Sequence, residues 1–69
     1  MFIKVNDKYG KELRINVDSI LYYKTNNGNG TEINLNDKSY VIVEESAEEI
    51  DRMVELVQVN KQSSVSLNK

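Results

Sequence analysis

Cysteine and histidine are both absent from this sequence of 69 residues. Without cysteine no disulfide can form, and without either residue the usual ligands of a structural zinc site are missing. A domain of this length buries only about 60% of the surface of its unfolded chain, so its own core stabilises it weakly. Oligomerisation is the remaining common support for a small domain of this kind. We therefore expect a homo-oligomer.

The same two absences restrict the chemistry that the chain can perform. Histidine is the usual general base, cysteine supplies thiol nucleophiles, and both bind transition metals. Acidic residues gather near the predicted start of a helix, but the helix dipole and solvation already account for carboxylates there. These residues are Glu44, Glu45, Glu48, Glu49 and Asp51. We therefore expect no enzymatic activity, no metal and no cofactor.

A long apolar run is also lacking. No stretch approaches the roughly 20 residues that a membrane-spanning helix requires. The net charge of -2 and the pI near 5.0 argue against binding to nucleic acid, whose phosphates demand concentrated lysine and arginine. Residues 1–4 read as the beginning of a strand and not as an apolar export segment, so we expect a cytoplasmic location.

Alternating side chains predict strands in the first two thirds of the chain. In residues 12–17, Leu13, Ile15 and Val17 alternate with polar residues and are expected to face the core. Residues 31–36 alternate in the same way. Strand propensity is high in three further segments, which are residues 2–5, 19–23 and 40–43.

Polar clusters rich in asparagine, aspartate and glycine separate these segments, at residues 6–10, 26–30 and 36–37. Such residues tolerate the backbone conformations of tight turns. Asp18 and Ser19 indicate a bend or bulge between the second and third strands. The sequence therefore predicts an antiparallel meander of about five strands.

A helix is predicted directly after the last strand. Ser46 and Glu49 have the spacing of a capping box, in which each side chain accepts a hydrogen bond from a free backbone N–H at the helix start. The apolar residues that follow lie on one stripe of the helix, namely Ala47, Ile50, Met53, Val54 and Val57. We expect the helix to end near residues 59–60. The prediction is one α+β domain over residues 1–60 and a flexible polar tail over residues 61–69.

Two of the strand segments are apolar on both faces. Strict alternation places Ile20 and Tyr22 opposite Leu21 and Tyr23, and it places Tyr40 and Ile42 opposite Val41 and Val43. One helix covers only one face of a small sheet, and monomers rarely expose a contiguous apolar patch. Either a second copy covers the other face, or the sheet curls into a small closed barrel, or twisted strands leave aromatics partly exposed. The candidate interface or ligand-lining residues are Tyr22, Tyr23, Tyr40, Val41 and Val43.

The sequence resembles the small flagellar protein family called FlbD, also known as the swarming-motility protein SwrD. The likeness covers about residues 1–57. It lies in the turn Gly10-Lys11-Glu12 and in the junction between strand and helix, residues 43–50. The resemblance implies a non-enzymatic protein that acts on flagellar motor function.

A weaker likeness is to the LytTR DNA-binding domain, in Asp18-Ser19-Ile20-Leu21-Tyr22 and Asp37-Lys38-Ser39-Tyr40. The chain lacks the basic segments with which such a domain reads DNA. Besides this DNA-binding function, two functions of different classes therefore stay open. One is a self-associating protein-interaction module, and the other is a homo-oligomer that sequesters a small ligand at its subunit seams, as a phage counter-defence protein does. Both a bacterial and a phage source fit the composition.

Overall fold

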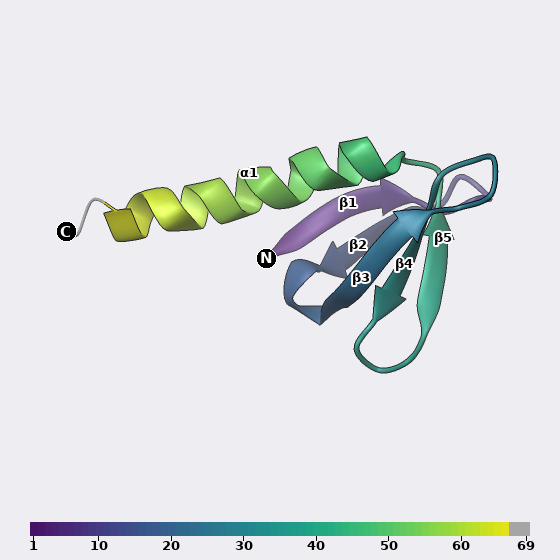
Figure 1. Cartoon of the computed structure of the whole chain (residues 1–69), viewed down its shortest axis with the longest axis horizontal. Helices are drawn as coiled ribbons and strands as arrows, with labels where there is room; N and C mark the ends of the chain where they lie inside the picture. Colours follow the sequence, from purple (N-terminus) through teal and green to yellow (C-terminus); the bar gives the residue numbers. More distant parts are fainter. Residues whose placement is uncertain (67–69) are drawn as a thin grey trace.

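A computed structural model describes the backbone of residues 1–66 and the side chains of residues 1–58. Five antiparallel strands are followed by one helix, as Figure 1 shows. This order confirms the predicted α+β class. The elements are β1 (Phe2–Asn6), β2 (Glu12–Asn16), a 3-10 turn (Val17–Ser19), β3 (Ile20–Thr25), β4 (Thr31–Leu35), β5 (Tyr40–Val43) and α1 (Ala47–Ser66).

The strands form two sheets, and the prediction of one continuous meander is wrong between β2 and β3. β1 pairs with β2, and β3, β4 and β5 form a separate sheet in that order. The 3-10 turn Val17–Ser19 lies between the two sheets, and the Asn16 side chain caps it by accepting the Asp18 N–H at 3.0 Å. The predicted bend at Asp18 and Ser19 is thus present, and it redirects the chain enough to end the pairing.

The two sheets join at one corner, where the end of β1 meets the end of β5. Asp7 forms an isolated bridge with Val43, and the Glu44 N–H donates to the Asn6 carbonyl at 2.8 Å. The Glu45 carboxylate accepts the backbone N–H and the side-chain amide of Asn6, both at 3.0 Å. The strands therefore wrap around a core instead of forming one flat layer.

The core draws on both sheets and on the helix. Its buried members are Ile3, Val5, Ile15, Ile33, Val43 and Ile50. Leu13 and Val17 pack against them, so the inner face predicted for residues 12–17 is confirmed. Thr31 is a fully buried polar residue, and its hydroxyl donates to the Glu45 carbonyl at 2.8 Å. That bond compensates for the removal of the hydroxyl from water.

Helix α1 begins with the predicted capping box. The Ser46 N–H donates to the Glu49 carboxylate at 2.8 Å, and the Glu49 N–H donates to the Ser46 hydroxyl at 3.1 Å. One turn later Ile50 is fully buried, and Met53 and Val54 pack against the core. The predicted apolar stripe therefore does attach the helix to the strands.

The helix is longer than the sequence predicts. It continues to Ser66, so the predicted end near residues 59–60 is wrong. Residues 59–66 contain neither proline nor glycine, the two residues that most strongly oppose a helix, although they lack a clear apolar period. Residues 67–69 of the predicted tail lie outside the described part. Figure 1 shows α1 passing along β1 and its C-terminal half extending beyond the strands.

A bulge in β3 changes which of its side chains face inward. The pairing of β3 with β4 is irregular between Ile20 and Tyr22, and this leaves Leu21 as an extra residue. Ile20 and Tyr23 consequently pack against the core, whereas Leu21 and Tyr22 are exposed. The prediction that Ile20 and Tyr22 share one face, opposite Leu21 and Tyr23, is therefore wrong.

Tyr23 joins β3 to α1. Its hydroxyl donates to the Asp51 carboxylate. Burial raises the pKa of Tyr23 to about 12, and the hydrogen bond to Asp51 and the negative charges of Asp51 and Glu55 act in the same direction. The folded protein thus holds the Tyr23 proton more tightly than an unfolded chain does, in which tyrosine has a pKa of about 10.

This difference predicts a loss of stability in alkali. Below pH 10 the Tyr23 hydroxyl is protonated in both the folded and the unfolded state, and its contribution to the free energy of unfolding is at its full value. Between pH 10 and about 12 the unfolded chain binds fewer protons, so the free energy of unfolding falls as the pH rises. Denaturant unfolding of the wild type and of Tyr23→Phe across this range measures the effect. We expect a steeper decline in the wild type, and parallel curves would contradict this assignment.

Candidate functional site

The strand register defines a solvent-facing surface on the three-stranded sheet. On the side away from the core, Tyr22 pairs with Asn34 and Asn34 pairs with Tyr40. In the next row along the strands, Lys24 pairs with Glu32 and Glu32 pairs with Ile42. We call this surface the outer face, and its members are Tyr22, Lys24, Glu32, Asn34, Tyr40 and Ile42.

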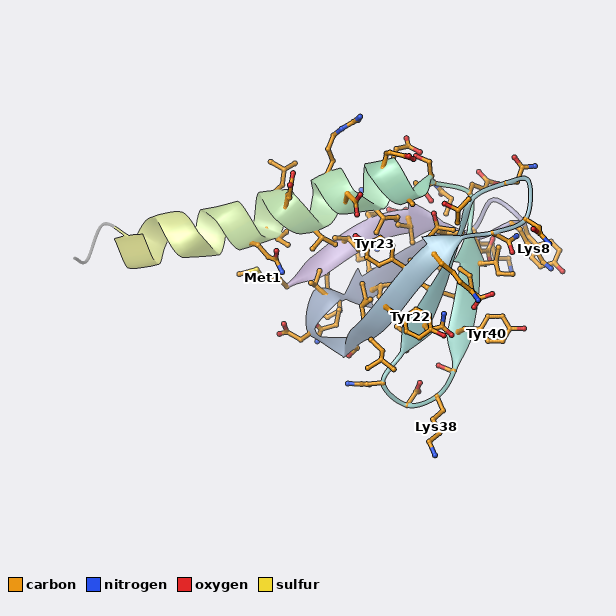
Figure 2. All side chains as sticks on the ribbon, viewed as in Figure 1. Met1, Lys8, Tyr22, Tyr23, Lys38 and Tyr40 are labelled. Carbon is orange, nitrogen blue, oxygen red and sulfur yellow. The ribbon has the colours of Figure 1, made fainter. Side chains whose placement is uncertain are left out.

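The outer face exposes aromatic side chains. Tyr22 is 51% exposed and Tyr40 is 63% exposed, and Figure 2 shows both rings on this sheet. Two strand spacings, about 10 Å, separate the two residues. Leu21, at the bulge beside Tyr22, is 67% exposed. Helix α1 packs on the core side and leaves these residues uncovered.

The polar residues at the centre of the outer face already have partners. The Asn34 side-chain amide donates to the Glu32 carboxylate at 3.0 Å, and the Lys24 ammonium lies 3.9 Å from the same carboxylate. Burying an unpaired polar group is expensive, whereas a paired one loses less when water is removed. A partner could therefore cover the outer face without leaving Glu32 isolated.

The outer side of β1 and β2 has a different character. Glu12 forms ion pairs with Lys4 at 3.2 Å and with Arg14 at 3.7 Å, and all three side chains are largely exposed. Exposed pairs of this kind contribute about 0–1 kcal/mol and are favourably hydrated. This side is therefore mainly a charged, solvated surface, although Phe2 at the start of β1 is 60% exposed on it.

The candidate residues divide between the two sides of that sheet. Tyr22 and Tyr40 lie on the outer face. Tyr23 and Val41 pack against the core, and Val43 belongs to it. The first two residues can therefore meet a partner directly, whereas the other three position the strands that carry them.

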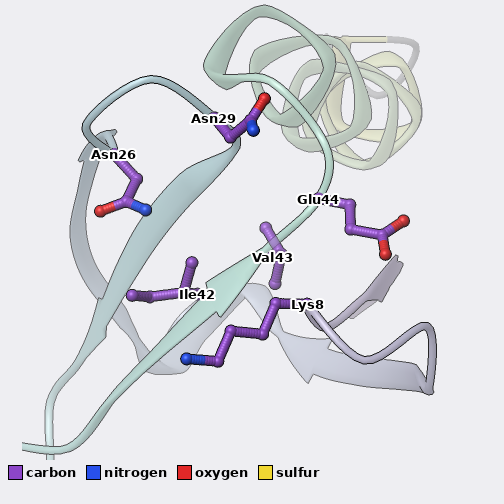
Figure 3. Close-up of a pocket in the computed structure, with 6 residues that line it drawn as sticks. All are labelled: Lys8, Asn26, Asn29, Ile42, Val43 and Glu44. Atoms are coloured by element: carbon purple, nitrogen blue, oxygen red, sulfur yellow. The ribbon is translucent and has the colours of Figure 1, made fainter.

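A pocket of about 460 Å³ opens where three segments converge, as Figure 3 shows. The turn after β1 contributes Lys8, the hairpin loop between β3 and β4 contributes Asn26 and Asn29, and β5 contributes its last residues. A second hollow of about 300 Å³ lies beside it, and both are lined by Lys8 and Ile42. Tyr40 lines the second hollow. The two hollows share Lys8 and Ile42 and therefore lie next to each other along β5.

Backbone contacts hold the walls of this pocket. Gly30 has a φ of +70°, and a Cβ atom placed on it would lie 2.0 Å from the Val43 carbonyl oxygen. The hairpin loop therefore touches β5 as only glycine allows. In the opposite wall, the Asp7 carboxylate accepts the N–H groups of Tyr9 and Lys11, each at 2.9 Å. The sequence gives the turn residues but no signal that Lys8 and Asn29 come together.

The described residues contain no group of three or more carboxylates placed to hold a metal ion. Within the same part of the chain, no helix combines the length and apolar character of a membrane span. Comparisons with protein-family models, curated proteins and solved structures find no match to this chain. The function is therefore inferred from the two surfaces just described.

Proposed function

We propose that this protein is a small, non-catalytic interaction module that self-associates through the outer face of its three-stranded sheet. The observation that carries the proposal is the row in which the exposed Tyr22 and Tyr40 flank the half-buried Asn34, on the side that α1 does not cover. Aromatic side chains exposed together on one face of a sheet are typical of interaction surfaces. Tyrosine suits such a surface because it combines apolar area with a polar hydroxyl.

A second copy of the chain fits this row. Tyr22 and Tyr40 flank Asn34 on either side. A two-fold axis near Asn34 would bring Tyr22 of one copy onto Tyr40 of the other, which is the self-complementary pattern of a symmetric dimer. Asparagine both donates and accepts hydrogen bonds, so two Asn34 side chains can also pair across the axis.

The size of the outer face sets the strength of this association. Three strands of about five residues cover about 15 by 17 Å, or about 250 Å² of flat surface. Stable complexes bury about 800 Å² on each partner. The outer face alone therefore supports a weak, concentration-dependent dimer.

The proposed biological setting follows from the resemblance to the flagellar family. A non-enzymatic accessory protein needs a surface for protein contacts and no reactive centre. An aromatic row beside a solvated, charged sheet agrees with that role. Affinity capture with the purified protein as bait tests this setting directly. Recovery of a motor component is expected, and capture that shows no enrichment of flagellar proteins would contradict it.

The self-association is tested by sedimentation velocity over protein concentrations from micromolar to near millimolar. The variant Tyr22→Lys places a charge in the aromatic row and is expected to remain monomeric throughout. Phe2→Lys is the matched control, because Phe2 is 60% exposed but lies on the charged side of β1 and β2. It should associate like the wild type. A wild type that stays monomeric at the highest concentration would overturn the proposal.

A further inference from the structure

The two hollows along β5 differ in character, and together they form a groove. We define the β5 groove by Lys8, Asn26, Asn29, Tyr40 and Ile42. The larger hollow is lined mainly by polar side chains, and the smaller one contains the aromatic ring of Tyr40. Pockets of this size hold small metabolites when a few polar groups converge beside apolar surface.

Lys8 supplies a cation that both hollows share. Among residues 1–58, whose side chains the structure describes, the ion pairs do not include Lys8. The neighbouring Asp7 carboxylate is occupied by two backbone N–H groups. Figure 3 shows the Lys8 ammonium and the Glu44 carboxylate pointing toward opposite sides of the pocket. The Lys8 ammonium lies over the Tyr9 ring, 5.4 Å from the ring centroid. A contact with a ring face does not use up the three N–H donors of an ammonium, so the group is still able to bind an anion.

The hairpin loop adds neutral hydrogen-bonding groups. The side chains of Asn26 and Asn29 line the same hollow as Lys8, and Figure 3 shows them along its upper rim. An asparagine amide provides two donors and a carbonyl acceptor. A phosphate at Lys8 could accept from these amides, and sugar hydroxyls could donate to their carbonyl oxygens.

The other end of the groove suits a planar ring. Tyr40 and Ile42 are two residues apart on β5, so their side chains project from the same face of the sheet. Base stacking on an aromatic side chain contributes about 1–3 kcal/mol. An exposed tyrosine beside an isoleucine offers both a stacking partner and an apolar floor.

We propose that the β5 groove binds a nucleoside monophosphate. The base lies on Tyr40 and Ile42, and the phosphate lies at Lys8 within reach of Asn26 and Asn29. This site does not depend on self-association. Tyr40 also belongs to the outer face, so a bound nucleotide and a second copy of the chain would compete for the Tyr40 ring.

The test is an NMR titration of ¹⁵N-labelled protein at a low concentration, at which the proposed dimer is dissociated. The probes are adenosine 5′-monophosphate, adenosine and inorganic phosphate, each added up to millimolar concentration. We expect the monophosphate to shift the amides of Lys8, Asn26, Asn29 and Tyr40. Adenosine and phosphate should each bind about tenfold more weakly, because each keeps only one of the two contacts.

Matched lysine variants locate the phosphate. Lys8→Met keeps the aliphatic stem without the charge and is expected to weaken monophosphate binding about tenfold. Lys11→Met changes a lysine of the same turn that does not line the groove, and it should bind like the wild type. Equal binding by both variants, phosphate binding as tightly as the monophosphate, or no shifts at millimolar nucleotide would each overturn the assignment. Because sedimentation is measured separately, failure here leaves the proposed self-association intact.

Discussion

Replacing Gly30 with alanine is expected to lower the free energy of unfolding by about 3 kcal/mol or more, for two reasons that add. At a φ of +70° an L side chain is strained, at a cost of about 1–2 kcal/mol. The new Cβ would also lie 2.0 Å from the Val43 carbonyl oxygen. Because that oxygen is a backbone atom, no rotation of a side chain relieves the clash, and the loop must separate from β5.

Gly28 provides the control for this prediction. It belongs to the same loop and has a φ of +80°, but no atom lies within 4 Å of the position that its Cβ would take. Gly28→Ala should therefore show the backbone strain alone, about 1 kcal/mol. Denaturant unfolding at one fixed low concentration gives both values, because association would otherwise change the apparent stability. Equal losses in the two variants would show that the contact with Val43 is not tight.

Replacing Ile50 with alanine is expected to lower the free energy of unfolding by about 2–5 kcal/mol. Ile50 is fully buried and is the one residue of α1 among the buried core members of the described chain. A domain of this size has a total stability of only about 3–10 kcal/mol. A large part of the protein should therefore be unfolded at 37 °C, with the helix detached from the strands.

Leu56 provides the control on the same helix. Its side chain is 63% exposed, so Leu56→Ala removes little buried surface and should change stability by less than about 0.5 kcal/mol. Both substitutions improve helix propensity or leave it nearly unchanged, so the comparison isolates packing. Similar losses in both variants, measured by thermal unfolding followed by circular dichroism, would contradict the placement of Ile50 at the centre of the interface.

Local patterns in the sequence predict much of this fold. Alternation in residues 12–17 identifies the inner residues of β2, because side chains on a strand alternate strictly. The capping box of Ser46 and Glu49 forms with both of its hydrogen bonds. Such features depend on neighbours within a few residues, and a single sequence contains that information.

Features that depend on distant contacts are not predicted. The bulge at Leu21 is invisible because every residue of the segment 20–23 is apolar, so a shift by one residue leaves the pattern unchanged. The bridge from Asp7 to Val43 is likewise set by tertiary packing, whereas the turn that separates β2 from β3 is a local feature. The bulge matters for function, since it puts Tyr22 on the outer face and Tyr23 against the core.

The β5 groove is also a feature that the sequence does not predict, because it depends on contacts between distant segments. Lys8, Asn29 and Tyr40 come from three separate turns and strands, and no spacing in the sequence connects them. Asn29 is recognisable as a turn residue, which is a local property. Its position opposite Lys8 follows from the contact of Gly30 with β5 and from the corner at which the two sheets join.

The central claim is that copies of the chain meet through the outer face, and amide NMR spectra recorded at increasing protein concentration test it most directly. We expect concentration-dependent shifts at Leu21, Tyr22, Asn34 and Tyr40, with the amides of Lys4, Glu12 and Arg14 on the charged side unchanged. Spectra that do not change with concentration, or shifts confined to the charged side, would contradict the claim.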